Sequence, residues 1–94
     1  MNFKQWLEAF GPEVIMVRPE WLYDKQPPRI KEIMSLQRKE VNYLNDLKQS
    51  LQDKGFEQPL RVRKDWSVYD GLHRLRAALD MELEQIPVFI LPAS

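Results

Sequence analysis

The chain has 94 residues, of which 44% are hydrophobic and 30% are charged, and 14 basic and 14 acidic side chains give it a formal net charge of +0. This length and composition predict a single soluble domain over residues 1–94 with a small core, and they leave no room for a second domain. Because the charge is balanced, we do not expect the whole molecule to be attracted to nucleic acid, although a local basic patch can still bind a phosphate group.

The absence of cysteine from the sequence narrows the chemistry further. It excludes disulfides, zinc sites built on thiolates and catalysis by a cysteine nucleophile. The N-terminal residues contain no long apolar segment of the kind found in signal peptides. No apolar run reaches the ~18 residues of a membrane-spanning helix. We therefore expect a cytoplasmic protein without a membrane partner.

Hydrophobic spacing in the first third of the chain predicts a helix, a strand and a loop. Apolar side chains recur at helical spacing over residues 2–10, which form the main part of an N-terminal helical extension (1–13). The core domain is expected over residues 14–91. It begins with an apolar run at 14–17, which predicts a strand that is central in its sheet or covered on both faces. Consecutive prolines within residues 24–28 predict a loop.

The middle of the chain, residues 29–54, follows a helical pattern. Apolar side chains define a short segment at 30–34 and a longer amphipathic segment at 41–51. We expect Ser35 to cap the start of the longer helix. Gly55 is expected to end it in the left-handed conformation.

The last third of the chain predicts a hairpin, a helix and a final strand. Apolar and basic residues alternate over 59–63, and a second β-branched and aromatic stretch follows at 67–69, so residues 59–69 are expected to form a hairpin. A helix follows and ends near Met81. The apolar run at 86–91 predicts the final strand, and Pro87 suggests that this strand lies at a sheet edge or that the proline takes its first position.

The most informative segment joins the hairpin to the helix, with the sequence Asp-Gly-Leu-His-Arg-Leu-Arg-Ala-Ala at residues 70–78. A strand, a glycine turn and a basic first helical turn follow one another there. The N-terminus of a helix presents unpaired backbone N–H groups and the positive end of the helix dipole. Glycine allows a bound group to approach the backbone closely. The segment therefore predicts an anion site, most naturally for a phosphate.

Helical geometry assigns different directions to the side chains of this segment. Leucines are expected to face the core, a histidine and an arginine share one flank with an aspartate, and a second arginine points elsewhere. Arginine suits a phosphate because its planar guanidinium offers several donors. The residues concerned are Leu72, Leu75 and Leu79 in the core, His73, Arg76 and Asp80 on the flank, and Arg74 on the other side.

Each candidate also has a purely structural interpretation. His73 can cap or pack, Arg76 can pair with Asp80, Arg74 can bridge an acid, and Asp70 can serve as the N-cap. A supporting basic patch at Arg61, Arg63 and Lys64 can likewise be an ordinary solvated face.

Residues 71–77 resemble the glycine-x-x-arginine-x-arginine-alanine box of the ParB N-terminal domain. The similarity is good over residues 50–91 and looser over 14–91. Gln58-Pro59-Leu60-Arg61-Val62 resembles the strand that follows the family's long helix, and 86–90 resembles the strand after the box. The resemblance implies an α/β (α+β) fold in which helices pack on a small mixed sheet, of ParB/sulfiredoxin type.

The superfamily also contains sulfiredoxin, free serine kinases and ParB-like nucleases, and the resemblance implies a nucleotide or phosphate group near the box. By position, Gly71 would allow close approach, and His73 and Arg74 would contact phosphate oxygens. Arg76 would support the site or bind a second phosphate. The implied cofactor is a nucleoside triphosphate with Mg²⁺.

The departures from the family pattern exclude some activities. Leu72 stands where sulfiredoxin needs its cysteine, so reduction of sulfinic acids is excluded. The sequence ends at Ser94, before the second box and the helix-turn-helix domain of chromosome-segregation ParB proteins, so a CTP-gated DNA clamp is not expected. A free serine kinase would need a longer chain and a catalytic acid that we do not identify.

Three functions remain open. The first is a module that binds a nucleotide or a nucleic-acid phosphate at residues 70–76, with a regulatory role on DNA. The second is a metal-dependent nuclease or phosphotransferase, for which Asp70 is the first candidate acid and Asp65 and Glu57 are the others. The third is a protein that binds or inhibits another protein, as in phage and mobile-element accessory proteins, with exposed tryptophans as anchors. Those tryptophans are Trp6, Trp21 and Trp66.

Overall fold

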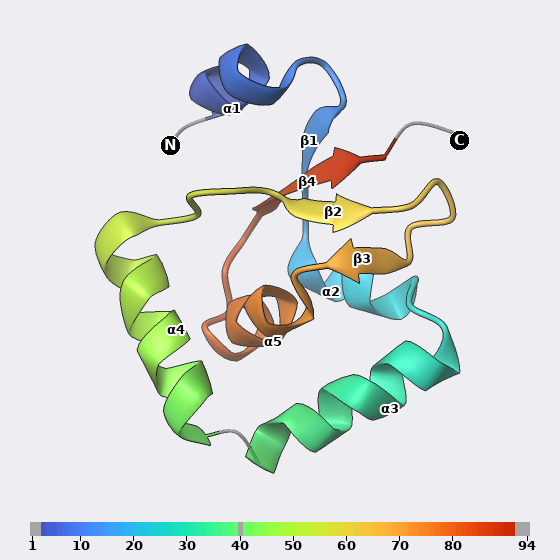
Figure 1. Cartoon of the computed structure of the whole chain (residues 1–94), viewed down its shortest axis with the longest axis vertical. Coiled ribbons are helices and arrows are strands. Elements are labelled where there is room, and N and C mark those ends of the chain that lie inside the picture. The colour runs from blue at the N-terminus through green and yellow to red at the C-terminus, as the bar shows by residue number, and fades with distance from the viewer. Residues whose placement is uncertain (1–2, 40, 92–94) are drawn as a thin grey trace.

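The computed structural model describes residues 3–39 and 41–91, and these ranges contain five α-helices, one short 3-10 helix and four strands (Figure 1). In chain order the elements are α1 (Phe3–Phe10), β1 (Val14–Val17), α2 (Pro19–Asp24), α3 (Pro28–Leu36), η1 (Gln37–Lys39), α4 (Val41–Lys54), β2 (Leu60–Val62), β3 (Val68–Asp70), α5 (Leu72–Asp80) and β4 (Ile86–Ile90). Among these helices, none is both long and apolar enough to cross a membrane. This arrangement confirms the predicted mixed α/β architecture.

The four strands form one mixed sheet in the order β1-β4-β2-β3. The β1–β4 and β2–β3 pairs are antiparallel, and the β4–β2 pair is parallel. The predicted hairpin is therefore confirmed as β2–β3. The parallel neighbour of β2 is the C-terminal strand β4, which follows α5 in the chain.

The sheet order decides between the two alternatives predicted for the first strand and corrects the predicted position of the last. The run at 14–17 forms β1 at a sheet edge, so it is not central. The alternative of a strand covered on both faces fits instead, because Val14 is buried, Ile15 and Val17 lie against the core, and α1 contacts the strand. The strand containing Pro87 is interior rather than at an edge. A proline is tolerated there because the parallel ladder with β2 begins at Val88, one residue later.

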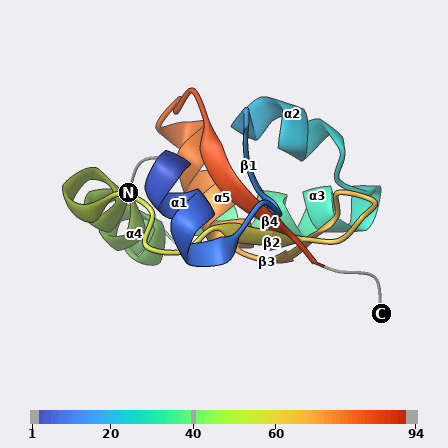
Figure 2. The same cartoon turned by 90° about the horizontal axis from the view of Figure 1, so that it is seen from above.

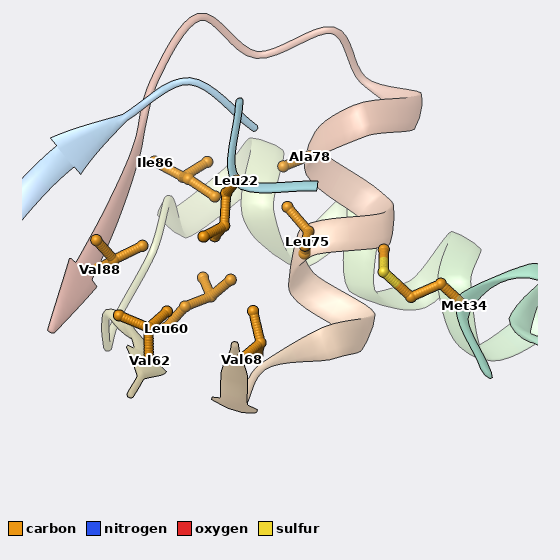
Figure 3. Close-up of a cluster of buried hydrophobic side chains, with 9 residues drawn as sticks. All are labelled: Leu22, Met34, Leu60, Val62, Val68, Leu75, Ala78, Ile86 and Val88. Carbon is orange, nitrogen blue, oxygen red and sulfur yellow. The ribbon is translucent and has the colours of Figure 1, made fainter. Parts of the chain in front are cut away.

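The core lies mainly between the sheet and α5, and α2 and α3 each add one buried side chain, Leu22 and Met34 (Figure 3). Leu75 and Ala78 of α5 point toward the buried side chains of the strands. The nine buried residues of this cluster are Leu22, Met34, Leu60, Val62, Val68, Leu75, Ala78, Ile86 and Val88. Figure 2 shows α2 and α5 on the same side of β2 and β3. Leu72 and Leu79 pack against the cluster while half-buried, as the helical spacing predicts.

Three local predictions have mixed outcomes. Gly55 ends α4 with a φ of +69°, and its N–H donates to the Leu51 carbonyl, as expected. Ser35 does not cap α4, because it lies inside α3 and its hydroxyl donates to the Glu32 carbonyl at 2.7 Å. The expected loop at 24–28 is shorter than predicted, because Pro28 takes the first position of α3, where a proline needs no N–H partner.

Candidate phosphate site at the start of helix α5

The turn between β3 and α5 has the backbone geometry expected of an anion site. Gly71 is the N-cap residue, with a φ of +112°, and no side chain caps the helix there. The first helical hydrogen bond runs from the Leu75 N–H to the Gly71 carbonyl at 2.9 Å. The backbone N–H groups of the first turn, residues 72–74, precede this first bond and point toward the end of the helix. Asp70, the alternative cap, belongs to β3 instead.

Gly71 also has a structural role that the sequence did not indicate. A Cβ atom placed on it would lie 2.8 Å from Leu60 Cγ and 3.2 Å from Arg74 Nη2. Leu60 is fully buried at the centre of the core. Glycine is thus required here both by the positive φ and by the close approach of β2.

Arg74 lies beside the turn and holds it to the segment that enters β2. Its Nη1 donates to the Gln58 carbonyl at 2.8 Å, with the Pro59 carbonyl at 3.5 Å. Its Nη2 lies 3.7 Å from the Asp70 carboxylate. The side chain is 20% exposed and lines a cleft of about 230 Å³ against the C-terminal half of α4. A bound anion would share this guanidinium with the carbonyls and with Asp70.

His73 points toward α3 and the start of α4 rather than toward Arg74's cleft. Its ring meets the Tyr43 ring edge-on, with 4.8 Å between centroids. It lines a cleft of about 200 Å³ together with Ile33, Leu36 and Gln37. Gln37 is only 5% exposed, and among the described residues its Oε1 has no hydrogen-bond partner. His73 thus packs against Tyr43, and a buried acceptor that the sequence analysis missed lies in the same cleft.

Arg76 lies one helical turn further along α5, away from the glycine turn. Its Nη2 is 2.6 Å from Asp80 Oδ1, and Lys48 Nζ of α4 lies 3.0 Å from Asp80 Oδ2. The predicted pairing of Arg76 with Asp80 is thus confirmed. The three charges tie α5 to α4 across a cleft of about 340 Å³. Only Gly71, His73 and Arg74 of the four proposed binding residues lie in the turn itself.

The charge network around Asp80 predicts a pH dependence of stability. Partial burial acts to raise the pKa of Asp80, but hydrogen bonds and charge from Arg76 and Lys48 outweigh it, so the pKa is lowered in the folded state. A carboxyl group whose folded pKa is lowered stabilises the protein above its unfolded pKa of about 3.9 and loses that contribution as the pH falls through the folded value. We expect Asp80→Asn to lower the free energy of unfolding by about 0.5–1 kcal/mol at pH 7.

Urea unfolding of both proteins at a series of pH values measures this effect. The difference between Asp80→Asn and wild type should shrink as the pH falls below about 4. A difference that stays constant down to the lowest pH at which both proteins fold would contradict the assigned role of the carboxylate.

The supporting basic patch lies on a different surface from the turn. Arg61 alternates along β2 with the buried Leu60 and Val62, so it faces away from the core. Arg63 and Lys64 lie at the hairpin connection, where the Arg63 N–H donates to the Ser67 carbonyl at 2.9 Å. The structure therefore separates these residues from His73, which lies on the α3 side.

The acids proposed for the enzymatic alternative are dispersed. Asp65 accepts hydrogen bonds from the Ser67 hydroxyl and backbone N–H, and these bonds lower its pKa. Asp70 pairs with Arg74, and Glu57 lines the Arg74 cleft. Over residues 3–39 and 41–91, no three His, Asp or Glu side chains are grouped to hold a metal ion.

The tryptophans proposed as partner anchors form one visible pair. Trp21 is 39% exposed, and its ring meets the half-buried Trp66 ring edge-on at 4.8 Å between centroids. The side chain of Trp6 lies outside the described part of the structure. Because Trp21 is exposed, it stays a candidate anchor for a protein partner.

Comparison with known proteins identifies the family. A family model of the ParB N-terminal domain matches residues 24–94. The structure is similar to that of a solved Pnob8-like ParB-N domain, with a TM-score of 0.61 and 21% sequence identity. That match covers 86% of this chain but only 30% of the solved chain. No curated protein matches the chain. The structural likeness shows the shared fold, and the family model spans the box and most of the chain, so this chain belongs to the ParB N-terminal domain family.

Proposed function

We propose that this domain binds a nucleotide, with the phosphate groups at the start of α5. The observation that carries this proposal is the uncapped first turn of α5, which follows a left-handed glycine and bears His73 and Arg74. Backbone N–H groups and the helix dipole favour an anion there. Arg74 adds a partly exposed guanidinium whose charge is only partly matched by Asp70, at 3.7 Å.

The neighbouring cleft supports a nucleotide rather than a bare phosphate. Gln37 Oε1 is buried beside His73, and a buried acceptor without a partner costs free energy. A hydroxyl or amino group of a ribose or base would satisfy it, while Ile33 and Leu36 supply apolar contact. The proposed ligand is a nucleoside triphosphate with Mg²⁺. In this proposal Arg76 supports the site by holding α5 against α4.

The role that follows from this proposal is regulatory rather than catalytic. The domain would report the presence of a nucleotide through the α3–α5 and α4–α5 contacts that the ligand touches. Because the chain belongs to the ParB N-terminal domain family, we propose that this regulatory role is exercised on DNA.

Thermal unfolding with a panel of nucleoside triphosphates, with and without Mg²⁺, tests the proposal. A ligand that binds only the folded state raises the midpoint of unfolding, and the rise grows with the logarithm of its concentration once that exceeds the Kd. We expect Arg74→Ala to weaken the affinity about tenfold or more, because a charge-assisted hydrogen bond is worth about 1.5–3 kcal/mol. His73→Ala is expected to weaken it less. Arg29→Ala, an exposed arginine of α3, serves as the matched control.

Arg74→Ala also loses its bond to the Gln58 carbonyl, so each variant is compared with its own ligand-free midpoint. Gln37→Leu separates the two parts of the ligand. It should weaken nucleoside triphosphate while leaving the affinity for inorganic triphosphate unchanged. A wild-type protein that responds to no nucleotide, or an Arg74→Ala protein that responds like wild type, would overturn the proposal.

A further inference from the structure

An exposed aromatic and basic surface lies on the face of the sheet opposite the core. Tyr69 of β3 is 59% exposed. Arg61 aligns with Asp70 and Val62 aligns with Val68, so Tyr69 is the additional residue of a β-bulge. Bulges redirect a side chain out of the regular ladder. The strand geometry therefore presents the Tyr69 ring to solvent at the hairpin edge of the sheet.

Arginines flank this ring from the neighbouring strand. The Arg63 guanidinium lies 5.0 Å from the centre of the Tyr69 ring, and Arg61 projects from the same face of β2. Lys64 is exposed in the turn that follows. Of the two acids of the hairpin, Asp65 accepts a hydrogen bond from Ser67, and Asp70 lies 3.7 Å from Arg74. Over residues 3–39 and 41–91, no hydrogen bond or ion pair engages the side chains of Arg61 and Lys64, so their donors can meet a ligand anion.

A cleft continues this surface toward β4. Its volume is about 260 Å³, and Arg61 lines it beside apolar side chains from α1, from β4 and from the segments next to β2 and β4. The other lining residues are Phe10, Gln58, Pro59, Phe89 and Leu91. Arg61 and Phe89 are aligned neighbours on β2 and β4. Across the sheet, Phe89 of β4 lies in the cleft, Arg61 of β2 lies next to it, and the exposed Tyr69 of β3 follows. The Arg63 guanidinium lies beside the Tyr69 ring.

We propose that this face of the sheet binds single-stranded nucleic acid. One base would stack on the Tyr69–Arg63 pair, and a neighbouring base would enter the cleft beside Phe89. The intervening phosphates would meet Arg61 and Lys64. Base faces are open to such stacking in single strands but are covered in duplexes, and aromatic side chains on an open sheet recognise them in this way. The proposal is independent of nucleotide binding at α5.

Fluorescence anisotropy with labelled oligothymidylate and oligouridylate of about 12 nucleotides tests it. We expect Tyr69→Ala to weaken binding about tenfold, and Tyr69→Phe, which keeps the ring, to bind as wild type does. Arg61→Ala should reduce the slope of log affinity against log salt concentration by about 0.7, the value for one phosphate contact on a single strand. Duplex DNA of the same sequence should bind more weakly than the single strand.

Trp21→Ala supplies the matched control, because Trp21 is another exposed aromatic ring with a cation, Lys25 Nζ, at 5.3 Å. It should leave oligonucleotide binding unchanged. Equal losses in Trp21→Ala and Tyr69→Ala would overturn the proposal, as would no binding by the wild-type protein. Loss in Arg74→Ala with none in Tyr69→Ala would place the oligonucleotide at α5, which would overturn this inference while leaving the nucleotide site standing.

Discussion

Gly71→Ala is expected to lower the free energy of unfolding by about 2–4 kcal/mol. A non-glycine residue in the left-handed region costs about 1–2 kcal/mol, and forcing extra volume into a packed core costs about 1–3 kcal/mol. Both terms apply here, because φ is +112° and the added Cβ would lie 2.8 Å from Leu60 Cγ. The reduced entropy of the unfolded chain offsets about 0.4–1 kcal/mol of the loss.

Gly55→Ala separates the two causes. Gly55 also has a positive φ, of +69°, but nothing lies within 4 Å of the Cβ position. This variant should therefore lose only about 1 kcal/mol, the backbone cost alone. Urea unfolding, monitored by tryptophan fluorescence, measures the loss in free energy of unfolding for both variants. Equal losses in the two variants would show that the contact with Leu60 costs nothing and that backbone strain is the whole effect.

Gln26→Leu is expected to lower the free energy of unfolding by about 2–3 kcal/mol. The buried Gln26 side chain joins α2 to the hairpin, since its Nε2 donates to the Trp66 carbonyl at 2.8 Å and its Oε1 accepts from the Val68 N–H at 2.9 Å. Leucine would remove these two bonds and a third, from Nε2 to the Leu22 carbonyl at 2.8 Å, and would deprive the buried Val68 N–H and the Trp66 carbonyl of their Gln26 partner. Each such group costs about 1–3 kcal/mol, and added apolar contact from leucine offsets part of the loss.

Gln49→Leu is the control for the loss of a glutamine hydrogen bond at the surface. Gln49 is exposed on α4, and its Nε2 donates to Asp53 Oδ1 at 3.0 Å. Such a pair contributes about 0.2–0.5 kcal/mol, so the variant should be close to wild type in urea unfolding. If Gln26→Leu were equally mild, the bridge between α2 and the hairpin would be dispensable.

The parts of the fold that depend on local sequence could be predicted. The hairpin, the end of α4 at Gly55 and the glycine turn before α5 each have turn residues beside a clear apolar period. The helix α2 escaped prediction because its six residues are too few to show a period. The interior place of β4 also escaped, because strand order depends on pairing between β4 and β2, which lie far apart in the chain.

In the candidate site, too, the features set by local sequence could be predicted, and those set by contacts with other elements could not. The position of His73 and Arg74 in the first turn of α5 follows from local sequence. The partners of those side chains do not, because Gln58, Tyr43 and Gln37 come from other elements. The sequence also groups Arg61, Arg63 and Lys64 with the box, whereas the alternation along β2 places Arg61 on the opposite face of the sheet. That separation is the reason for considering two ligand surfaces rather than one.

The most direct test of the central claim is an NMR titration of the ¹⁵N-labelled protein with a nucleoside triphosphate and Mg²⁺. If the phosphates bind at the uncapped end of α5, the largest amide shifts should fall on Leu72, His73 and Arg74, with a second group at Gln37. Inorganic triphosphate should shift the first group only. Saturable binding whose shifts leave residues 72–74 unmoved would contradict the assignment of the site to this turn.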